Sequence, residues 1–385
     1  MISHDALTAE ELAALVRRVF RPRADDRGIA VVADLPDGEI ADEEQWRARR
    51  RIAAEWAERM HALPLGLPSR LFFYRNVRMD NADLPDSAWE HPGGALPASA
   101  DELDPERAVS FAEIFRTSSI FFALTRFSAT APLKLAAREY GFRAATMPGF
   151  NPAMIPALRL DYEEIDRRAR HLKAHLDRAV EAELEFVVGE RETRLVLDLR
   201  YREAHASSGL MTEPGTAGNL PSGETYIVPY EGERDREPSR SAGTLPVEFA
   251  GEVVFFTIAA NRAVGVEGDG VEARQQAETL RREPAYGNLA ELGLGLLADF
   301  GIHPIGEILL DEKLGLHIAF GRSDHFGGQV GAADFSRPEA VVHIDRIFIP
   351  ETQPRVRVRL LDLRMAGGET LPLMRDGHYV LKGLA

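Results

Sequence analysis

The sequence of 385 residues contains no cysteine. This absence excludes disulfide bonds, zinc sites built from thiolates, iron–sulfur clusters and a cysteine nucleophile. A chain without cysteine is typical of a reducing compartment, and we expect a cytoplasmic protein. Residues 1–20 agree with this expectation, because acidic and helically spaced apolar residues stand where a signal peptide has a basic and then an apolar segment.

Long apolar runs and an excess of basic residues are absent as well. The longest apolar runs, such as residues 253–260, are too short to cross a bilayer. Lys and Arg number 46 against 61 Asp and Glu, which gives a net charge of −15. We therefore expect neither a membrane nor a nucleic acid as a partner. The GxSxG elbow of serine hydrolases and the Walker phosphate loop are also missing.

The first part of the chain alternates apolar runs with amphipathic segments. Strands are expected at residues 29–35, 71–77, 118–124 and 143–147, and helices at 43–61 and 131–140. Strands that alternate with helices are typical of a mostly parallel sheet with helices on its faces. The sequence therefore predicts an α/β domain over residues 1–160.

The pattern changes after residue 160. Apolar residues step by three and four from Tyr162 to Ala179, which predicts a linking helix over residues 161–186. Short alternating runs follow at 193–200, 252–258, 306–310, 316–320, 340–348 and 355–363. These runs predict a β-rich α+β domain over residues 187–385.

Four short segments of this second domain carry side chains suited to metal binding. They are NLPSGE (219–224), AELGLG (290–295), DEKLGLHIAFG (311–321) and VHID (342–345). The candidate ligands are Glu224, Glu291, Glu312, His317, His343 and Asp345. Four carboxylates and two imidazoles suit a pair of divalent ions that activate water, and such ligands fit Zn, Co, Mn or Mg.

Two of these segments place ligands on strands. His343 and Asp345 stand two apart in a strand-like run, so both side chains leave the same face. Glu224 enters a strand directly after a Pro-Ser-Gly turn, which suits a ligand held on a rigid element. Taken singly, residues such as His343 and Asp345 are also typical of solvated positions on a half-exposed strand.

The other two segments are interpreted from their glycines. We expect residues 306–310 and 316–320 to form a hairpin in which Gly315 adopts a left-handed conformation. Glu312 and His317 would then lie at the turn, with Lys313 near a carboxylate. An ordinary polar hairpin is the alternative. Glu291 stands among small and apolar residues, where a metal would offset the cost of burying its charge. The alternative is an exposed helical glutamate before a glycine cap.

In their order and spacing the four segments together resemble the thermophilic metallopeptidase family of aminopeptidases S and T, over about residues 145–350. The resemblance implies that the six candidate residues bind two metal ions with at least one bridging carboxylate. It also implies release of N-terminal residues from peptides and a homodimer. The expected substrate is a peptide or small amide with a free amino terminus.

The chain differs from this family after the HIA histidine, where the family has a catalytic tyrosine. Here the stretch reads GRSDHFGG, with Asp324 and His325. His325 is a candidate donor to the tetrahedral intermediate, and a simple loop histidine is the alternative. Glu224 is the candidate proton carrier, because a ligand next to a turn adjusts most easily.

Two other functions stay open. Ring-cleaving dioxygenases of dihydroxypyridines have a similar fold and bind one ferrous ion, for which His317, His343 and Asp345 would serve here. A site for a single iron would not need Glu224, Glu291 and Glu312 as ligands. Their presence therefore favours two ions. The third possibility is an amide hydrolase or maturation factor of the same fold, which the missing tyrosine supports.

Overall fold

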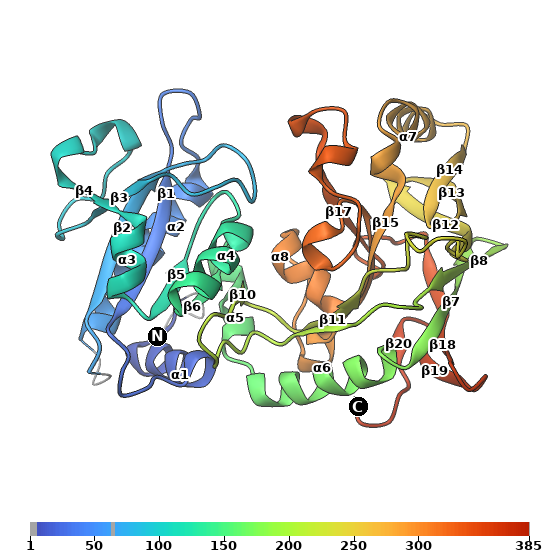
Figure 1. Cartoon of the computed structure of the whole chain (residues 1–385), viewed down its shortest axis with the longest axis horizontal. Coiled ribbons are helices and arrows are strands. Elements are labelled where there is room, and N and C mark those ends of the chain that lie inside the picture. The colour runs from blue at the N-terminus through green and yellow to red at the C-terminus, as the bar shows by residue number, and fades with distance from the viewer. Residues whose placement is uncertain (1–5, 63–65, 385) are drawn as a thin grey trace. The chain divides into compact units, whose positions relative to one another are not determined.

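The computed structural model describes residues 6–62 and 66–384, which belong to two compact units (Figure 1). The first unit comprises Met1–Glu163 and Gly209–Ser222. The second comprises Glu164–Ser208 and Gly223–Ala385 and holds all six candidate ligands. Among the described residues, no helix is long and apolar enough to cross a membrane.

The first unit contains a seven-stranded sheet in the order β10-β6-β5-β1-β2-β3-β4. Its strands are β1 (Ile29–Leu35), β2 (Ser69–Arg75), β3 (Ser87–Glu90), β4 (Ala108–Ser110), β5 (Ile120–Ala123), β6 (Arg143–Thr146) and β10 (Ala217–Asn219). The strands from β10 to β2 pair in parallel, and β3 and β4 pair antiparallel. This sheet confirms the predicted α/β class.

Helices cover both faces of this sheet. They are α1 (Ala9–Phe20), α2 (Glu44–His61), α3 (Phe111–Thr117), α4 (Thr130–Tyr140) and the short α5 (Ile155–Leu158). Phe122 of β5 contacts Phe20 of α1 and Trp56 of α2, with ring centroids 5.2 and 5.7 Å away. The next residue back, Phe121, contacts Phe115 of α3 at 5.6 Å. Since neighbouring strand residues point to opposite faces, α1 and α2 cover one face and α3 the other.

The second unit is rich in antiparallel strands, as the sequence predicts. Its larger sheet has the order β14-β13-β12-β8-β7-β18-β19-β20. These strands are β7 (Ala179–Val188), β8 (Arg191–Asp198), β12 (Ala242–Phe249), β13 (Glu252–Ala259), β14 (Arg262–Glu267), β18 (Arg357–Met365), β19 (Thr370–Arg375) and β20 (His378–Tyr379). The helices are α6 (Tyr162–Leu176), α7 (Val271–Arg282) and α8 (Ile308–Asp311).

The predicted linking helix is shorter than expected. Helix α6 ends at Leu176, and β7 begins at Ala179, within the range predicted to be helical. From Ala182 to Phe186 every second residue of β7 is buried, which is the period of a strand and not of a helix. Pairing with β8 and β18 on both sides stabilises β7 as a strand, so tertiary contacts decide this boundary.

The predicted hairpin before His317 is wrong. Residues 308–311 form α8, and a 3₁₀ turn at Glu312–Leu314 leads into the next strand. The Asp311 carboxylate accepts hydrogen bonds from the backbone N–H groups of residues 305 and 306, both at 2.9 Å, and so closes the loop before α8. Gly315 has an extended φ of −178°, and a Cβ there would lie 2.8 Å from Ile349. Close packing, not a left-handed turn, therefore requires this glycine.

The smaller sheet has the order β17-β16-β15-β11-β9 and is antiparallel throughout. Its strands are β9 (His205–Ser207), β11 (Glu224–Ile227), β15 (Leu289–Gly295), β16 (Leu316–Gly321) and β17 (His343–Ile347). One face packs into the apolar core through residues such as Ile227, Leu292, Leu294, Ile318 and Phe320. The alternate residues form the opposite face, and they include five of the six candidate ligands.

Candidate metal centre

Small residues separate the candidate ligands on this face. The strand register places a glycine or alanine beside each ligand: Gly295 beside Glu224, Gly293 beside His317, Ala319 beside Glu291 and Asp345, and Gly321 beside His343. A Cβ at Gly293 would lie 1.8 Å from Nε2 of His317, so the imidazole lies directly over this glycine. The glycines of AELGLG therefore leave room for ligands from the neighbouring strands.

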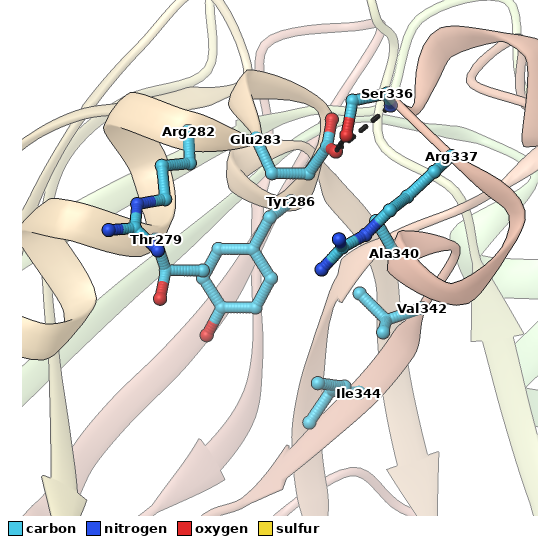
Figure 2. A pocket seen from close by; sticks show the side chains of 9 residues that line it. All are labelled: Thr279, Arg282, Glu283, Tyr286, Ser336, Arg337, Ala340, Val342 and Ile344. Atoms are coloured by element: carbon cyan, nitrogen blue, oxygen red, sulfur yellow. Dashed lines mark hydrogen bonds between the residues drawn. The ribbon is translucent and has the colours of Figure 1, made fainter.

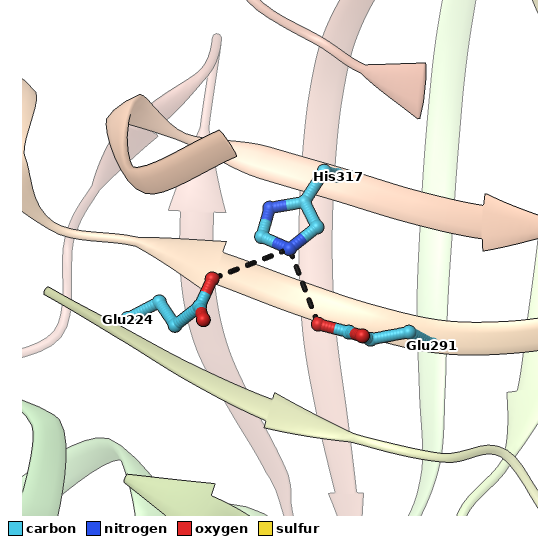
Figure 3. Close-up of side chains that lie close together, drawn as sticks. All are labelled: Glu224, Glu291 and His317. Carbon is cyan, nitrogen blue, oxygen red and sulfur yellow. Dashed lines mark hydrogen bonds and ion pairs between the residues drawn. The ribbon is translucent and has the colours of Figure 1, made fainter. Parts of the chain in front are cut away.

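The first group of ligands consists of Glu224, Glu291 and His317 (Figure 3). Nε2 of His317 lies 3.5 Å from Oε2 of Glu224 and 3.3 Å from Oε1 of Glu291. All three residues are buried. Three strands thus bring three donor atoms within 4.8 Å of one another.

The second group consists of Glu291, His343 and Asp345. Nε2 of His343 lies 3.3 Å from Oε2 of Glu291 and 3.6 Å from Oδ1 of Asp345. Glu291 therefore belongs to both groups, with one oxygen toward each histidine. This is the arrangement of a carboxylate that bridges two metal ions.

Backbone carbonyl groups orient both imidazoles. Nδ1 of His343 lies 2.8 Å from the carbonyl oxygen of Arg322, and Nδ1 of His317 lies 3.3 Å from that of Gly315. An Nδ1–H that donates to a carbonyl oxygen leaves the Nε2 lone pair for a metal. Both Nε2 atoms point toward the carboxylates, as a pair of metal sites requires.

Lys313 contacts two of the candidate ligands. Its Nζ lies 2.6 Å from Oε1 of Glu224 and also forms an ion pair with Glu312, and the residue is 1% exposed. Glu312 lies outside both ligand groups, so its direct ligation of a metal stays a prediction. Lys313 instead holds Glu224 by one oxygen and directs the other oxygen toward His317.

The charges and donor atoms of the centre fit divalent cations. Four carboxylates and one ammonium leave three uncompensated negative charges when every carboxylate is ionised and both histidines are neutral, which is the protonation state that binds cations. Oε2 of Glu224 is buried, and no residue in the described part of the chain forms a hydrogen bond with it. A buried polar atom of this kind is costly unless a ligand satisfies it, and a metal ion would.

The metal-free centre has strongly shifted pKa values. Burial, reinforced by the charges of Asp345 and Glu224, raises the pKa of Glu312 to about 8 despite the neighbouring Lys313. Burial opposes the charge on His317, but the hydrogen bond and charge of Glu291 outweigh it and raise the His317 pKa to about 9. The pKa of His343 also lies well above its usual range, because burial is outweighed by the charges of Asp345 and Glu291.

These shifts predict that metal binding releases protons. At about pH 7 both histidines are protonated in the metal-free protein, and a metal must displace about two protons per chain to reach Nε2. Apparent metal affinity should therefore rise with pH up to about 9. Calorimetry in buffers of different ionisation enthalpy measures the proton release. An affinity that stays constant between about pH 6 and 9 would contradict this expectation.

His325 lies beside the second group of ligands. It is on the 3₁₀ turn Asp324–Phe326, and its ring centroid is 5.5 Å from that of His343. Burial, followed by the positive charge of His343, lowers the His325 pKa to about 4. The ring is therefore neutral at about pH 7, and a neutral imidazole still has one N–H group that can donate a hydrogen bond to a tetrahedral intermediate. Its catalytic role stays a prediction.

The sequence interpretation missed an aromatic row on the same face. Tyr226 lies between His205 and Phe326, with ring centroids at 5.2 and 5.1 Å, and Phe326 lies 5.0 Å from His343. The strand period offered a signal for Tyr226, because it stands two residues after Glu224 and so shares its face. Nothing local in the sequence indicates that Phe326 or His205 joins this row.

A separate cavity of about 470 Å³ lies next to β17 (Figure 2). Val342 and Ile344 line it, and they alternate along the chain with the candidate ligands His343 and Asp345. Figure 2 also shows Glu283 hydrogen-bonded to Ser336 at its rim. Because neighbouring strand residues point to opposite faces, the side chains of His343 and Asp345 point away from this cavity.

Comparisons with known proteins identify the fold. No family model matches the sequence, and no curated protein matches it. Among solved structures, 2,5-dihydroxypyridine dioxygenase from Pseudomonas putida is similar with a TM-score of 0.61 at 14% identity, over 98% of this chain and 100% of that one. Wild-type AmpT from Thermus thermophilus is similar with a TM-score of 0.54 at 17% identity, over 97% and 99%. The chain therefore shares one fold with both proteins over nearly its whole length.

Proposed function

We propose that this protein is a two-metal aminopeptidase. The observation that carries the proposal is Glu291, whose two oxygens lie between two ligand groups that each contain a histidine. The similarity to AmpT in fold, and the resemblance of the four segments to aminopeptidases S and T, support the same function. A cytoplasmic homodimer is part of this proposal, and sedimentation of the purified chain tests the dimer.

The residues have distinct roles in this proposal. Glu224 and His317 would hold one ion, His343 and Asp345 the other, and Glu291 both. Bound there, the ions would acidify a water molecule and polarise the scissile carbonyl. Lys313 keeps Glu224 in place through an ion pair. The backbone carbonyl groups that contact Nδ1 of His317 and His343 keep the Nε2 atoms of both rings directed at the metal ions. Glu224 is the proposed proton carrier to the leaving amine.

The net charge of the chain also suits the proposed substrate. A free amino terminus is a cation, and the chain as a whole carries a net charge of −15. A peptide blocked at its amino terminus lacks the positive charge. Release of residues from the free end, and not cleavage within the chain, is therefore the expected activity.

Metal counting and peptide turnover test this function together. We expect two divalent ions per chain after loading and dialysis, and release of amino acids from peptides that stops on chelation and returns with metal. N-acetylated copies of the same peptides serve as the matched control and should not be cleaved. Two ions without turnover of any peptide would favour an amide hydrolase or maturation factor that acts on one small substrate.

A single-iron dioxygenase is the second candidate. The fold similarity to the dihydroxypyridine dioxygenase favours it, and His317, His343 and Asp345 would supply two nitrogens and one carboxylate to ferrous iron. One iron per chain and oxygen uptake that depends on a dihydroxypyridine would establish this function and exclude the peptidase.

A further inference from the structure

Tyr226 lies on the metal-binding face of the smaller sheet. It follows Glu224 by two residues on β11, and the residue opposite it on β15 is Gly293. The next residue across the sheet is His317. Because Gly293 has no side chain, nothing on β15 separates the phenol of Tyr226 from the imidazole of His317.

Aromatic neighbours hold the ring of Tyr226 in place. His205 stacks on it with an interplanar angle of 30°, and Phe326 contacts it edge-on at 72°. On β11 the ring shares a face with Glu224, and the register across β15 places it in line with His317. Because its neighbours already restrict the ring, Tyr226 loses little conformational entropy when a substrate binds.

The hydroxyl group of Tyr226 is available for a ligand. Within residues 6–62 and 66–384 it has no hydrogen-bond partner. The other tyrosine near the ligands, Tyr379, donates to the carbonyl oxygen of Gly295 at 2.9 Å, and Tyr230 donates to that of Glu237 at 2.8 Å. Tyr226 thus differs from both in having a free hydroxyl beside the metal ligands.

We propose that the Tyr226 hydroxyl donates a hydrogen bond to the substrate oxygen that becomes negative when water attacks the amide carbonyl. In this step the water oxygen bonds to the carbonyl carbon, the C=O electron pair moves to oxygen, and the water proton passes to a carboxylate. The hydroxyl of Tyr226 stays protonated and stabilises the new charge from a fixed position. This role rests on the proposed amide hydrolysis.

The test is the Tyr226→Phe variant, which keeps the ring and removes only the hydroxyl. We expect kcat to fall about 10²-fold, while KM changes less than about twofold, because the hydrogen bond forms in the transition state. Affinity of the metal-loaded protein for a phosphinic dipeptide, a tetrahedral mimic, should fall at least about tenfold. Metal stoichiometry and affinity for free leucine should not change.

Tyr201→Phe is the matched control. Tyr201 is exposed, and its hydroxyl contacts Glu237 away from the ligands, so the variant should behave as wild type. Unchanged kcat and phosphinate affinity in Tyr226→Phe would overturn the role of Tyr226, as would a wild type that does not bind the phosphinate. If the wild-type protein binds the phosphinate but cleaves no peptide, the proposed peptidase function is wrong. The difference in phosphinate affinity between the wild type and Tyr226→Phe would then still test the role of the Tyr226 hydroxyl.

Discussion

We expect Glu291→Gln to abolish both the proposed binding of two metal ions and the activity that depends on them. The carboxylate offers one oxygen to the group with His317 and the other to the group with His343, so one substitution weakens both sites. Glutamine keeps the size of the side chain, but it loses the charge and one of the two acceptor oxygens. We expect less than one ion per chain after dialysis, measured by elemental analysis, and a loss of turnover of at least about 10³-fold.

Glu283→Gln is the matched control for this substitution. Glu283 is also a buried glutamate, but it accepts hydrogen bonds from Ser336 and lies in neither ligand group. This variant should keep both ions and full turnover. If Glu291→Gln still binds two ions, Glu291 does not bridge them. If the variant binds one ion, Glu291 is a ligand of only one of the two sites.

We expect Lys313→Met to lower the free energy of unfolding of the metal-free protein. The ammonium is 1% exposed and compensates Glu224 and Glu312, so its removal leaves two carboxylates packed together in the interior. Loss of one partner from a buried ion pair costs about 3–5 kcal/mol of unfolding free energy. Loading with metal should recover part of this loss, because the ions supply positive charge next to Glu224 and bind only the folded chain.

Urea unfolding with and without metal measures both effects. Lys173→Met is the matched control, because Lys173 pairs with Asp177 and Glu203 while 29% of its side chain is exposed. Such surface pairs contribute about 0–1 kcal/mol. A loss in Lys313→Met no larger than in Lys173→Met would show that the buried carboxylates do not depend on this ammonium.

Local patterns in the sequence predicted much of the fold. Residues 29–35 form β1 as expected, and α2 and α4 begin within one residue of their predicted starts. His343 and Asp345 share one face of β17, and Glu224 opens β11, because a strand turns every second side chain to the same face. In these cases the spacing of apolar and polar residues along the sequence already matches the period of the helix or strand that forms.

The wrong predictions concern segments whose structure depends on distant partners. The helical spacing of apolar residues reaches Ala179, but apolar and acidic residues alternate from Ala182 to Phe186, and pairing with β8 and β18 makes this segment a strand. The segment before Gly315 has the glycine of a tight turn, but Ile349 packs against that glycine and α8 precedes it. Local propensity is weaker than such contacts, so sequence patterns misplace these elements.

The sequence alone determined the chemistry of the candidate ligands, since it set which side chains bear carboxylates and imidazoles and which of them alternate along a strand. The tertiary structure decided how they combine. Cross-strand register brought Glu291 between two histidines, placed Lys313 against Glu224 and set Tyr226 beside them over Gly293. The physical reason is that each of these relations joins different strands, and only sheet pairing and core packing fix which residues of different strands meet.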